Sequence, residues 1–123
     1  MRIFRFDAAV ARPITEFGSV GASIAPVARP GAGFVQLGCI YVAAGGCVGR
    51  HPAGEPQLFL VVAGEGWVSG ADGERVPIRT GQAAFWEPGE EHESGSEQGM
   101  AVMVLEAEAL DPARYMAEER VRP

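Results

Sequence analysis

The chain has 123 residues, a length for which we expect one folded domain, and a net charge of −6 at neutral pH. Its ten basic residues are all arginines and are scattered, which argues against a nucleic-acid partner because phosphate binding needs clustered positive charge. Lysine is absent, and its absence excludes Schiff-base chemistry and a P-loop lysine.

The first ten residues, MRIFRFDAAV, lack the apolar core of a signal peptide. No apolar stretch of the sequence approaches the roughly 20 residues that are needed to cross a bilayer. Cys39 and Cys47 form neither a CxxC motif nor a disulfide framework, so we expect reduced thiols. We therefore expect a cytoplasmic protein without a membrane partner.

Short apolar segments, separated by glycines and prolines, predict an all-β fold. In chain order they span residues 19–28, 33–43, 57–70, 83–89 and 99–110. Each has the length of a strand, and turn signals recur about every 8 to 12 residues, which is typical of a β-sandwich or barrel. We expect one compact domain over residues 1–123.

Turn and helix signals complete this prediction. The stretch 69–75 contains Asp72-Gly73 between apolar segments and predicts a hairpin turn, and Gly64-Glu65-Gly66 predicts a tight turn or a bend within the sheet. Residues 111–120 predict a short C-terminal helix, because Asp111 can cap it and Pro112 suits its first position.

Two of the predicted strands are apolar on both faces. In the strand that begins at Gln57, both Phe59 on one face and Leu60 on the other are apolar, and residues 100–105 repeat the pattern. A half-solvated sheet would alternate apolar and polar residues, so each face should be covered. We expect one face to line an interior and the other to pack in a homodimer; a second sheet of the same chain is the alternative.

Two segments carry a spacing of glycines and histidines that resembles the two motifs of the cupin superfamily. The first is GGCVGRHPAGEPQLFLVVAG, with His51 six residues after Gly45, and the second is GQAAFWEPGEEHESGS, with His92 eleven residues after Gly81. Sixteen residues separate the two motifs, which is within the family's short spacing. The resemblance implies a double-stranded β-helix, or jelly-roll barrel, with its motif-bearing core at about residues 34–105.

The resemblance also implies a divalent metal site in the barrel. Carried over position by position, it assigns the ligands His51, His92 and the amide oxygen of Gln57, for zinc, iron, nickel or manganese. The sequence departs from the motifs, because Ala53 stands in place of a second histidine and Gln57 in place of a glutamate. Two imidazoles and an amide carry no charge, so a firm site would need a carboxylate from elsewhere.

Several further residues are candidates for the site. Glu55 shares strand parity with Gln57, and Glu87 stands next to Trp86, where an indole could raise the pKa of a carboxyl and make it an acid or base. Phe59 and Trp86 are candidates for the walls of a substrate pocket. The alternative is that the histidines are hydrogen-bonded structural residues, that Glu87 lies in a solvated turn, and that the aromatic residues are core.

Two functions are consistent with these residues. The first is a small-molecule site with a divalent metal ion, in a metal-dependent oxygenase or isomerase, as the resemblance implies. The second is a non-catalytic module that binds or senses a metabolite, with the histidines as hydrogen-bonding groups. The fold alone does not choose between them.

Overall fold

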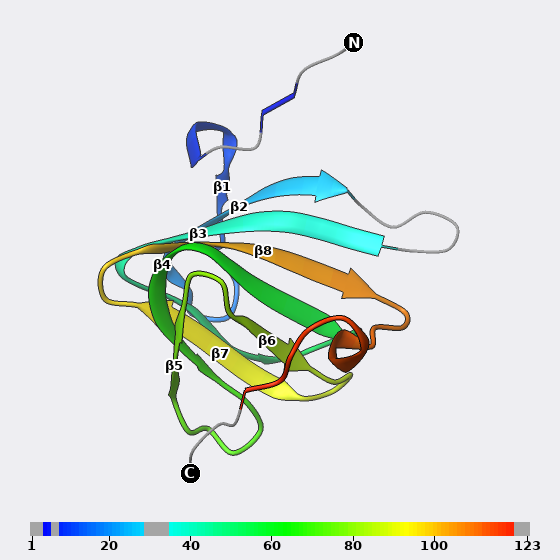
Figure 1. The fold of residues 1–123 in the computed structure, drawn as a ribbon. Coiled ribbons are helices and arrows are strands. Elements are labelled where there is room, and N and C mark those ends of the chain that lie inside the picture. Colours follow the sequence, from blue (N-terminus) through cyan, green and yellow to red (C-terminus); the bar gives the residue numbers. More distant parts are fainter. Residues whose placement is uncertain (1–3, 6–7, 29–34, 120–123) are drawn as a thin grey trace.

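The structure is a computed structural model, and it describes residues 4–5, 8–28 and 35–119. Almost all of the regular structure is β, and the strands form a barrel (Figure 1). This confirms the predicted all-β, jelly-roll class. The strands are β1 (Arg12–Pro13), β2 (Val20–Ala28), β3 (Val35–Pro52), β4 (Gln57–Ser69), β5 (Val76–Arg79), β6 (Ala83–Trp86), β7 (Glu91–Ser96) and β8 (Met100–Ala107), with 3₁₀ turns η1 (Ala8–Val10) and η2 (Pro112–Arg114).

The two long strands, β3 and β4, connect the two walls of the barrel. The first part of β3 pairs with β2 and β8, and its last part, from Gly46, pairs with β7. Strand β4 pairs with β8 and β6 up to Gly64 and then with β7 and β5. The changes of partner fall at Gly45 and Gly64, both with φ of +78°, a left-handed conformation that glycine adopts without strain. The motif glycines are therefore the corners of the barrel.

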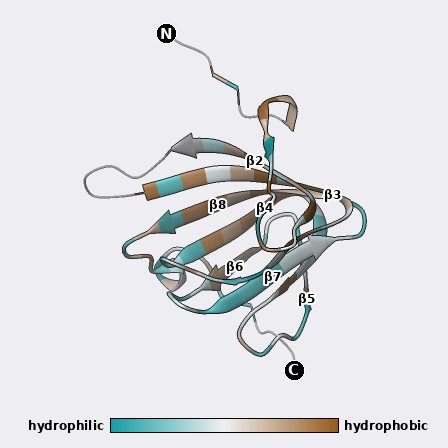
Figure 2. Cartoon of the chain, turned by 180° about the vertical axis from the view of Figure 1, so that it is seen from behind, coloured by the Kyte–Doolittle hydropathy of each residue, from teal (hydrophilic) through white to brown (hydrophobic). Residues whose placement is uncertain are grey.

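The core fills the space between the walls. Phe59 and Val61 on β4 face Val104 and Val102 on β8, and all four are at least 93% buried. Figure 2 shows hydrophobic residues concentrated along β3 and β8, whereas β7 is hydrophilic. The prediction that one face of these strands lines an interior is thus confirmed.

The opposite, outer face of β4 and β8 is only partly covered within the described residues. Leu58 is buried, Leu60 and Met103 are half-buried, and Val62 is 52% exposed. The predicted homodimer, which would cover this face, stays a prediction.

The turn predictions are confirmed, and the helix is shorter than predicted. Strands β4 and β5 pair from Val68 and Val76 around the predicted hairpin, and β4 bends at Gly64. Only η2 forms in the predicted helix 111–120, of which residue 120 lies outside the described residues; the side chain of Asp111 makes no capping hydrogen bond. Short helices need a buried apolar face, and η2 buries none of its residues. No helix in the described part of the chain is long and apolar enough to span a membrane.

Candidate functional site

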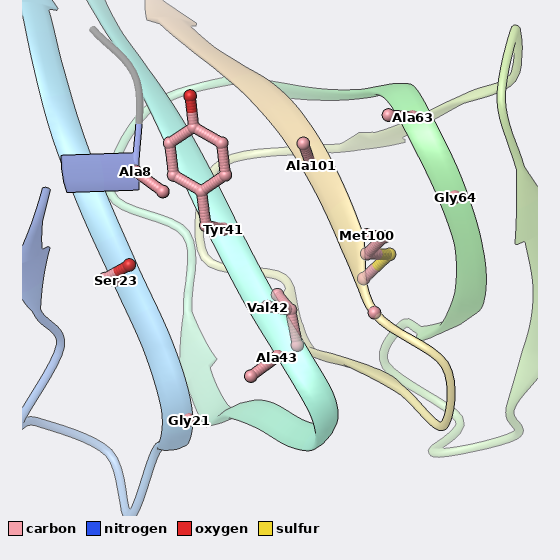
Figure 3. A pocket seen from close by; sticks show the side chains of 11 residues that line it. Ala8, Gly21, Ser23, Tyr41, Val42, Ala43, Ala63, Gly64, Met100 and Ala101 are labelled. Carbon is pink, nitrogen blue, oxygen red and sulfur yellow. The ribbon is translucent and has the colours of Figure 1, made fainter.

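A cavity of about 250 Å³ lies inside the barrel, and both histidines line it. A second hollow, of about 460 Å³, lies between β2, β3, β8 and β4 around Tyr41 (Figure 3). Among the described residues, those that line the second hollow are small or apolar, with Ser23 and Tyr41, and include no histidine or carboxylate. The groups with chemistry therefore face the interior cavity.

His51 and His92 are brought together by the pairing of β3 with β7. Their Cα atoms are cross-strand partners, and the ring centroids lie 4.4 Å apart at an interplanar angle of 57°. Nδ1 of His51 lies 2.7 Å from the carbonyl oxygen of Gly49, and Nδ1 of His92 lies 3.1 Å from that of Glu90. A carbonyl only accepts, so each Nδ1 donates and each Nε2 of the neutral ring keeps its lone pair.

His92 is the more buried of the two histidines. It is 3% exposed and stacks on the indole of Trp86, with centroids 4.3 Å apart. Its Nε2 is buried and has no hydrogen-bond partner among the described residues. Desolvation lowers the pKa of His92, and the charge of His51 lowers it further by a smaller amount. The hydrogen bond to the backbone of Glu90 acts in the opposite direction and raises it. The neutral form, with a free lone pair, is thereby favoured.

A strained turn between β1 and β2 covers His51. The ring of Phe17 stacks on His51 with centroids 3.9 Å apart and 9° between the planes. Phe17 and Gly18 have φ of +62° and +65°, and the Ser19 amide donates to the Glu16 carbonyl over 3.1 Å, which defines a type I′ turn. Left-handed φ is rare for an aromatic residue and costs of order 1–3 kcal/mol, so the turn is held by its surroundings.

Gly49 is the residue that lets this turn approach β3. A Cβ on Gly49 would lie 1.5 Å from the carbonyl oxygen of Phe17, so no other residue fits without displacing the turn. The Gly49 amide also donates to Oγ of Ser19 over 3.2 Å. The sequence did not predict Phe17 as a site residue, because its backbone conformation depends on this contact with a distant strand.

A row of polar residues crosses the cavity on adjacent strands. Gln36 on β3 is the cross-strand partner of Glu106 on β8, which is the partner of Gln57 on β4, and Gln57 in turn pairs with Trp86 on β6. All four line the cavity. Desolvation raises the pKa of Glu106, as does the charge of Glu55, while the charge of His51 opposes them.

Glu106 and Gln36 were missed by the sequence analysis, although a signal was present. Glu106 shares strand parity with Met100, Val102 and Val104, the inward face of β8. Extending that alternation by one step places a carboxylate in the cavity. Gln36 extends the inward face of β3 in the same way from Gly38 and Ile40.

The structure separates the predicted site residues into two groups. Five of them line the cavity, namely His51, Gln57, His92, Phe59 and Trp86, and their roles as metal ligands or pocket walls stay predictions. The other two, Glu55 and Glu87, are exposed and do not line it.

Both exposed glutamates lie in turns, and this corrects their predicted roles. Glu55 precedes Pro56 in the connection to β4, and Glu87 directly follows β6. The Glu87 amide donates to Oε1 of Glu90 over 3.1 Å, and the Glu90 amide donates to the carbonyl oxygen of Glu87 over 3.0 Å. Its side chain is thus in a solvated turn, and Glu106 is the carboxylate that the cavity holds instead.

The donor set can be compared with the needs of a divalent metal ion. Within the described ranges, no three side chains among histidines, cysteines, aspartates and glutamates gather closely enough to hold a metal ion. In both histidines the hydrogen bond from Nδ1 to a carbonyl oxygen fixes the tautomer and leaves the lone pair on Nε2. The two Nε2 atoms therefore suit two ligand positions on such an ion. The amide of Gln57 is a third, uncharged donor, so the residues fit an ion that takes its other ligands from a bound molecule.

The fold and these motifs define the class of protein. A sequence profile of the cupin domain matches residues 39–107, more than half of the chain, and the chain belongs to the cupin superfamily. No curated protein matches the sequence.

Three solved structures illustrate the shared fold. A predicted oxalate decarboxylase from Thermotoga maritima has a TM-score of 0.75 at 21% identity over 86% of this chain and 98% of its own. The polyketide cyclase RemF from Streptomyces resistomycificus has a TM-score of 0.75 at 20% identity over 89% and 80%. KdgF from Halomonas sp. has a TM-score of 0.69 at 18% identity over 88% and 97%. Identities this low show the fold alone.

Proposed function

We propose that this cupin binds a small organic molecule in its internal cavity, at a centre where His51 and His92 hold a divalent metal ion. The observation that carries the proposal is made at His92, which lines the cavity and whose Nε2 is buried and has no partner among the described residues. Leaving a buried acceptor unpaired costs about 1–3 kcal/mol, so an occupant that pairs with it is favoured.

The residues around the pair prepare it for an occupant. Gly49 and Glu90 fix the ring orientations through Nδ1, and the stacks with Phe17 and Trp86 restrict both rings further. Fixing the two histidine rings before an ion or molecule binds reduces the conformational entropy that is lost on binding. The turn that carries Phe17 also screens His51 from water.

When bound, a divalent ion would polarise an oxygen of the small molecule as a Lewis acid. The chain's own contribution to a reaction is the carboxyl of Glu106, which lines the same cavity and can hold a proton there. A dioxygenase of the two-histidine-one-carboxylate type would need a third ligand, which the described residues do not bring to the pair. Isomerisation by proton transfer is therefore the reaction class that we favour for a catalytic role.

A second candidate function is a metal-free binding module. Its support is the uncharged donor set, because two imidazoles and an amide leave the charge of an ion uncompensated. In this case Nε2 of His92 would accept a hydrogen bond from a hydroxyl or amide of the ligand. Either function uses the same cavity, and only the first needs a metal.

Metal binding to the untagged protein distinguishes these candidates. Elemental analysis, followed by calorimetric titration with Zn²⁺, Ni²⁺, Mn²⁺ or Fe²⁺, should give one ion per chain in the wild type and none in His51→Ala or His92→Ala. Glu87→Gln, an exposed glutamate outside the cavity, is the matched control and should bind as the wild type does. Absence of binding after incubation with excess ion would overturn the metal centre and leave the binding module.

A further inference from the structure

The charges around the cavity indicate which ligands it can accept. Among the described residues that line it, the charged side chains are Glu16 at its edge and Glu106 within it, both acidic. No arginine lines the described part of the cavity. Without a bound metal ion, a ligand carboxylate would therefore meet like charge, and no cationic side chain among the described lining residues would pair with it.

Arg50, which lies between Gly49 and His51 in the chain, does not supply that cation. Its guanidinium donates to the carbonyl oxygens of Gly70 and Ala71, both over 3.1 Å, and its Nε lies 3.1 Å from Oε2 of Glu91. These contacts engage Arg50 with the hairpin between β4 and β5. Its charge is paired outside the cavity.

The row Gln36–Glu106–Gln57 suits hydroxyl groups. A carboxyl accepts hydrogen bonds, and each amide both donates and accepts, so the row matches groups that do both, as a hydroxyl does. Cross-strand pairing places the three residues side by side on neighbouring strands. The row can therefore bind several hydroxyls on one edge of a ligand.

The remaining walls suit a flat ring. The rings of Phe59 and Trp86 meet edge to face with centroids 5.5 Å apart, and Trp86 stacks on His92. The cavity of about 250 Å³ is slightly smaller than the usual ligand pockets of about 300–1,000 Å³. A ligand of one ring fits this space and these aromatic walls.

We infer that the side chains of the cavity, in the absence of the metal ion, select an uncharged, hydroxyl-bearing ring and discriminate against carboxylates, with Glu106 as the residue that determines this selectivity. The inference rests on the proposed function, since it assigns a ligand class to the same cavity. A cavity with this selectivity would bind a small dicarboxylate poorly.

Two probes that differ in one group test the inference. 3-Hydroxybenzyl alcohol is uncharged at pH 7.5, and 3-hydroxybenzoate has the same ring with a carboxylate in place of the alcohol. The chain has two tryptophans, of which Trp86 lines the cavity and Trp67 lies under the guanidinium of Arg75 at 3.7 Å. The indole N–H resonance of Trp86 in ¹⁵N-labelled protein therefore reports binding, and that of Trp67, assigned with Trp67→Phe, is the internal control.

In protein freed of metal by dialysis against EDTA, we expect the alcohol to shift the Trp86 resonance and to bind about tenfold more tightly than the carboxylate. Glu106→Gln should reduce this ratio to about threefold or less, and Glu16→Gln, at an exposed position where folding is not at risk, should reduce it in the same direction. Glu108→Gln, which is exposed and does not line the cavity, should leave the ratio unchanged.

Equal or tighter binding of 3-hydroxybenzoate, or a ratio that Glu106→Gln leaves unchanged, would overturn the inference. If neither probe shifts Trp86 while the wild type still binds Zn²⁺ through His51 and His92, the ligand class is wrong and the metal centre stands. If Zn²⁺ binding is absent as well, the metal centre and the ligand class both fail.

Discussion

His51 and His92 are cross-strand partners whose rings lie 4.4 Å apart, and each is anchored at Nδ1 by a backbone carbonyl oxygen. Their chain positions are 41 residues apart, so the pair exists only because β3 and β7 are neighbours in the barrel. The pairing converts two histidines in strands into one chemical centre.

The buried imidazole of His92 should make the stability of the protein depend on pH. Desolvation lowers the pKa of His92 below its ordinary value of 6.5, so the unfolded chain takes up the proton first as the pH falls. The contribution to stability is present above pH 6.5 and is lost as the pH decreases through the lowered pKa of the folded state. Urea unfolding between pH 8 and 5 should show a steeper loss in the wild type than in His92→Gln.

A matched control for this pH dependence is Glu97→Gln, an exposed glutamate directly after β7. Its curve should parallel that of the wild type through this range. Parallel curves for the wild type and His92→Gln would show that burial does not perturb His92.

The carboxyl of Glu106 should produce a pH dependence of the opposite sign. Desolvation raises its pKa above the ordinary value of 4.5, so its contribution to stability is complete below pH 4.5 and is lost as the pH rises through the raised pKa. Glu106→Gln lacks this loss, and its stability relative to the wild type should therefore increase across that window. Chemical unfolding at a series of pH values measures the difference, and an increase equal to that of Glu108→Gln would contradict it.

The contact between Gly49 and the turn of Phe17 should tolerate no side chain. Gly49→Ala should destabilise the protein by about 1–3 kcal/mol or displace the turn, because its Cβ would overlap the carbonyl oxygen of Phe17. Gly54→Ala is the matched control, since nothing lies within 4 Å of its Cβ. Thermal and urea unfolding of the two variants measure this, and equal stabilities would show that the turn does not pack against β3 in this way.

Phe17 should protect His51 from solvent. Phe17→Gly removes the stack and relieves the left-handed strain, so diethyl pyrocarbonate should modify His51 several-fold faster than in the wild type. His92, which is 3% exposed, should stay protected in both proteins. Peptide mass spectrometry resolves the two sites, and an unchanged rate at His51 would exclude Phe17 as its cover.

The outer face of β4 and β8 should mediate a homodimer. Light scattering of the purified chain should give twice the chain mass of 13.0 kDa, because a second copy would cover Leu60, Met103 and Val62. Met103→Glu should shift the mass to that of one chain, and Thr15→Glu, on the exposed turn before β2, should not. A wild-type mass of one chain at high concentration would contradict the dimer.

The sequence predicted the barrel because its evidence is local and periodic. Glycines at fixed spacing mark corners, and Gly45 and Gly64 are indeed where β3 and β4 change partners. The histidines were predicted from the same spacing. Phe59 and Trp86 were candidates because aromatic side chains commonly form the walls of ligand pockets, and all of these residues line the cavity.

The parts of the site that were missed depend on contacts between distant segments. Glu106 has the strand parity of Val104, but residues 100–105 are apolar on both faces, so the sequence alone does not show which face is inward. The sequence signals for a carboxylate, next to Gln57 and Trp86, favoured Glu55 and Glu87, which do not line the cavity. The position of Phe17 over His51 could not be predicted, because its left-handed backbone is held by a contact with Gly49 on another strand. The C-terminal helix is shorter than predicted, because the signals for it were residues suited to a helix start, Asp111 and Pro112. The segment has no apolar face to bury, so these signals do not extend the helix.

The protonation and pairing of the imidazole nitrogens test the proposed centre most directly. Long-range ¹H–¹⁵N correlation spectra of the native protein at pH 8 report which ring nitrogen of His51 and His92 carries the proton. We predict Nδ1–H in both rings, and a large shift confined to the Nε2 resonances when Zn²⁺ is added. An Nε2–H tautomer at His92, or Nε2 resonances that neither Zn²⁺ nor the hydroxylated ring probe moves, would contradict a ligand site at this pair.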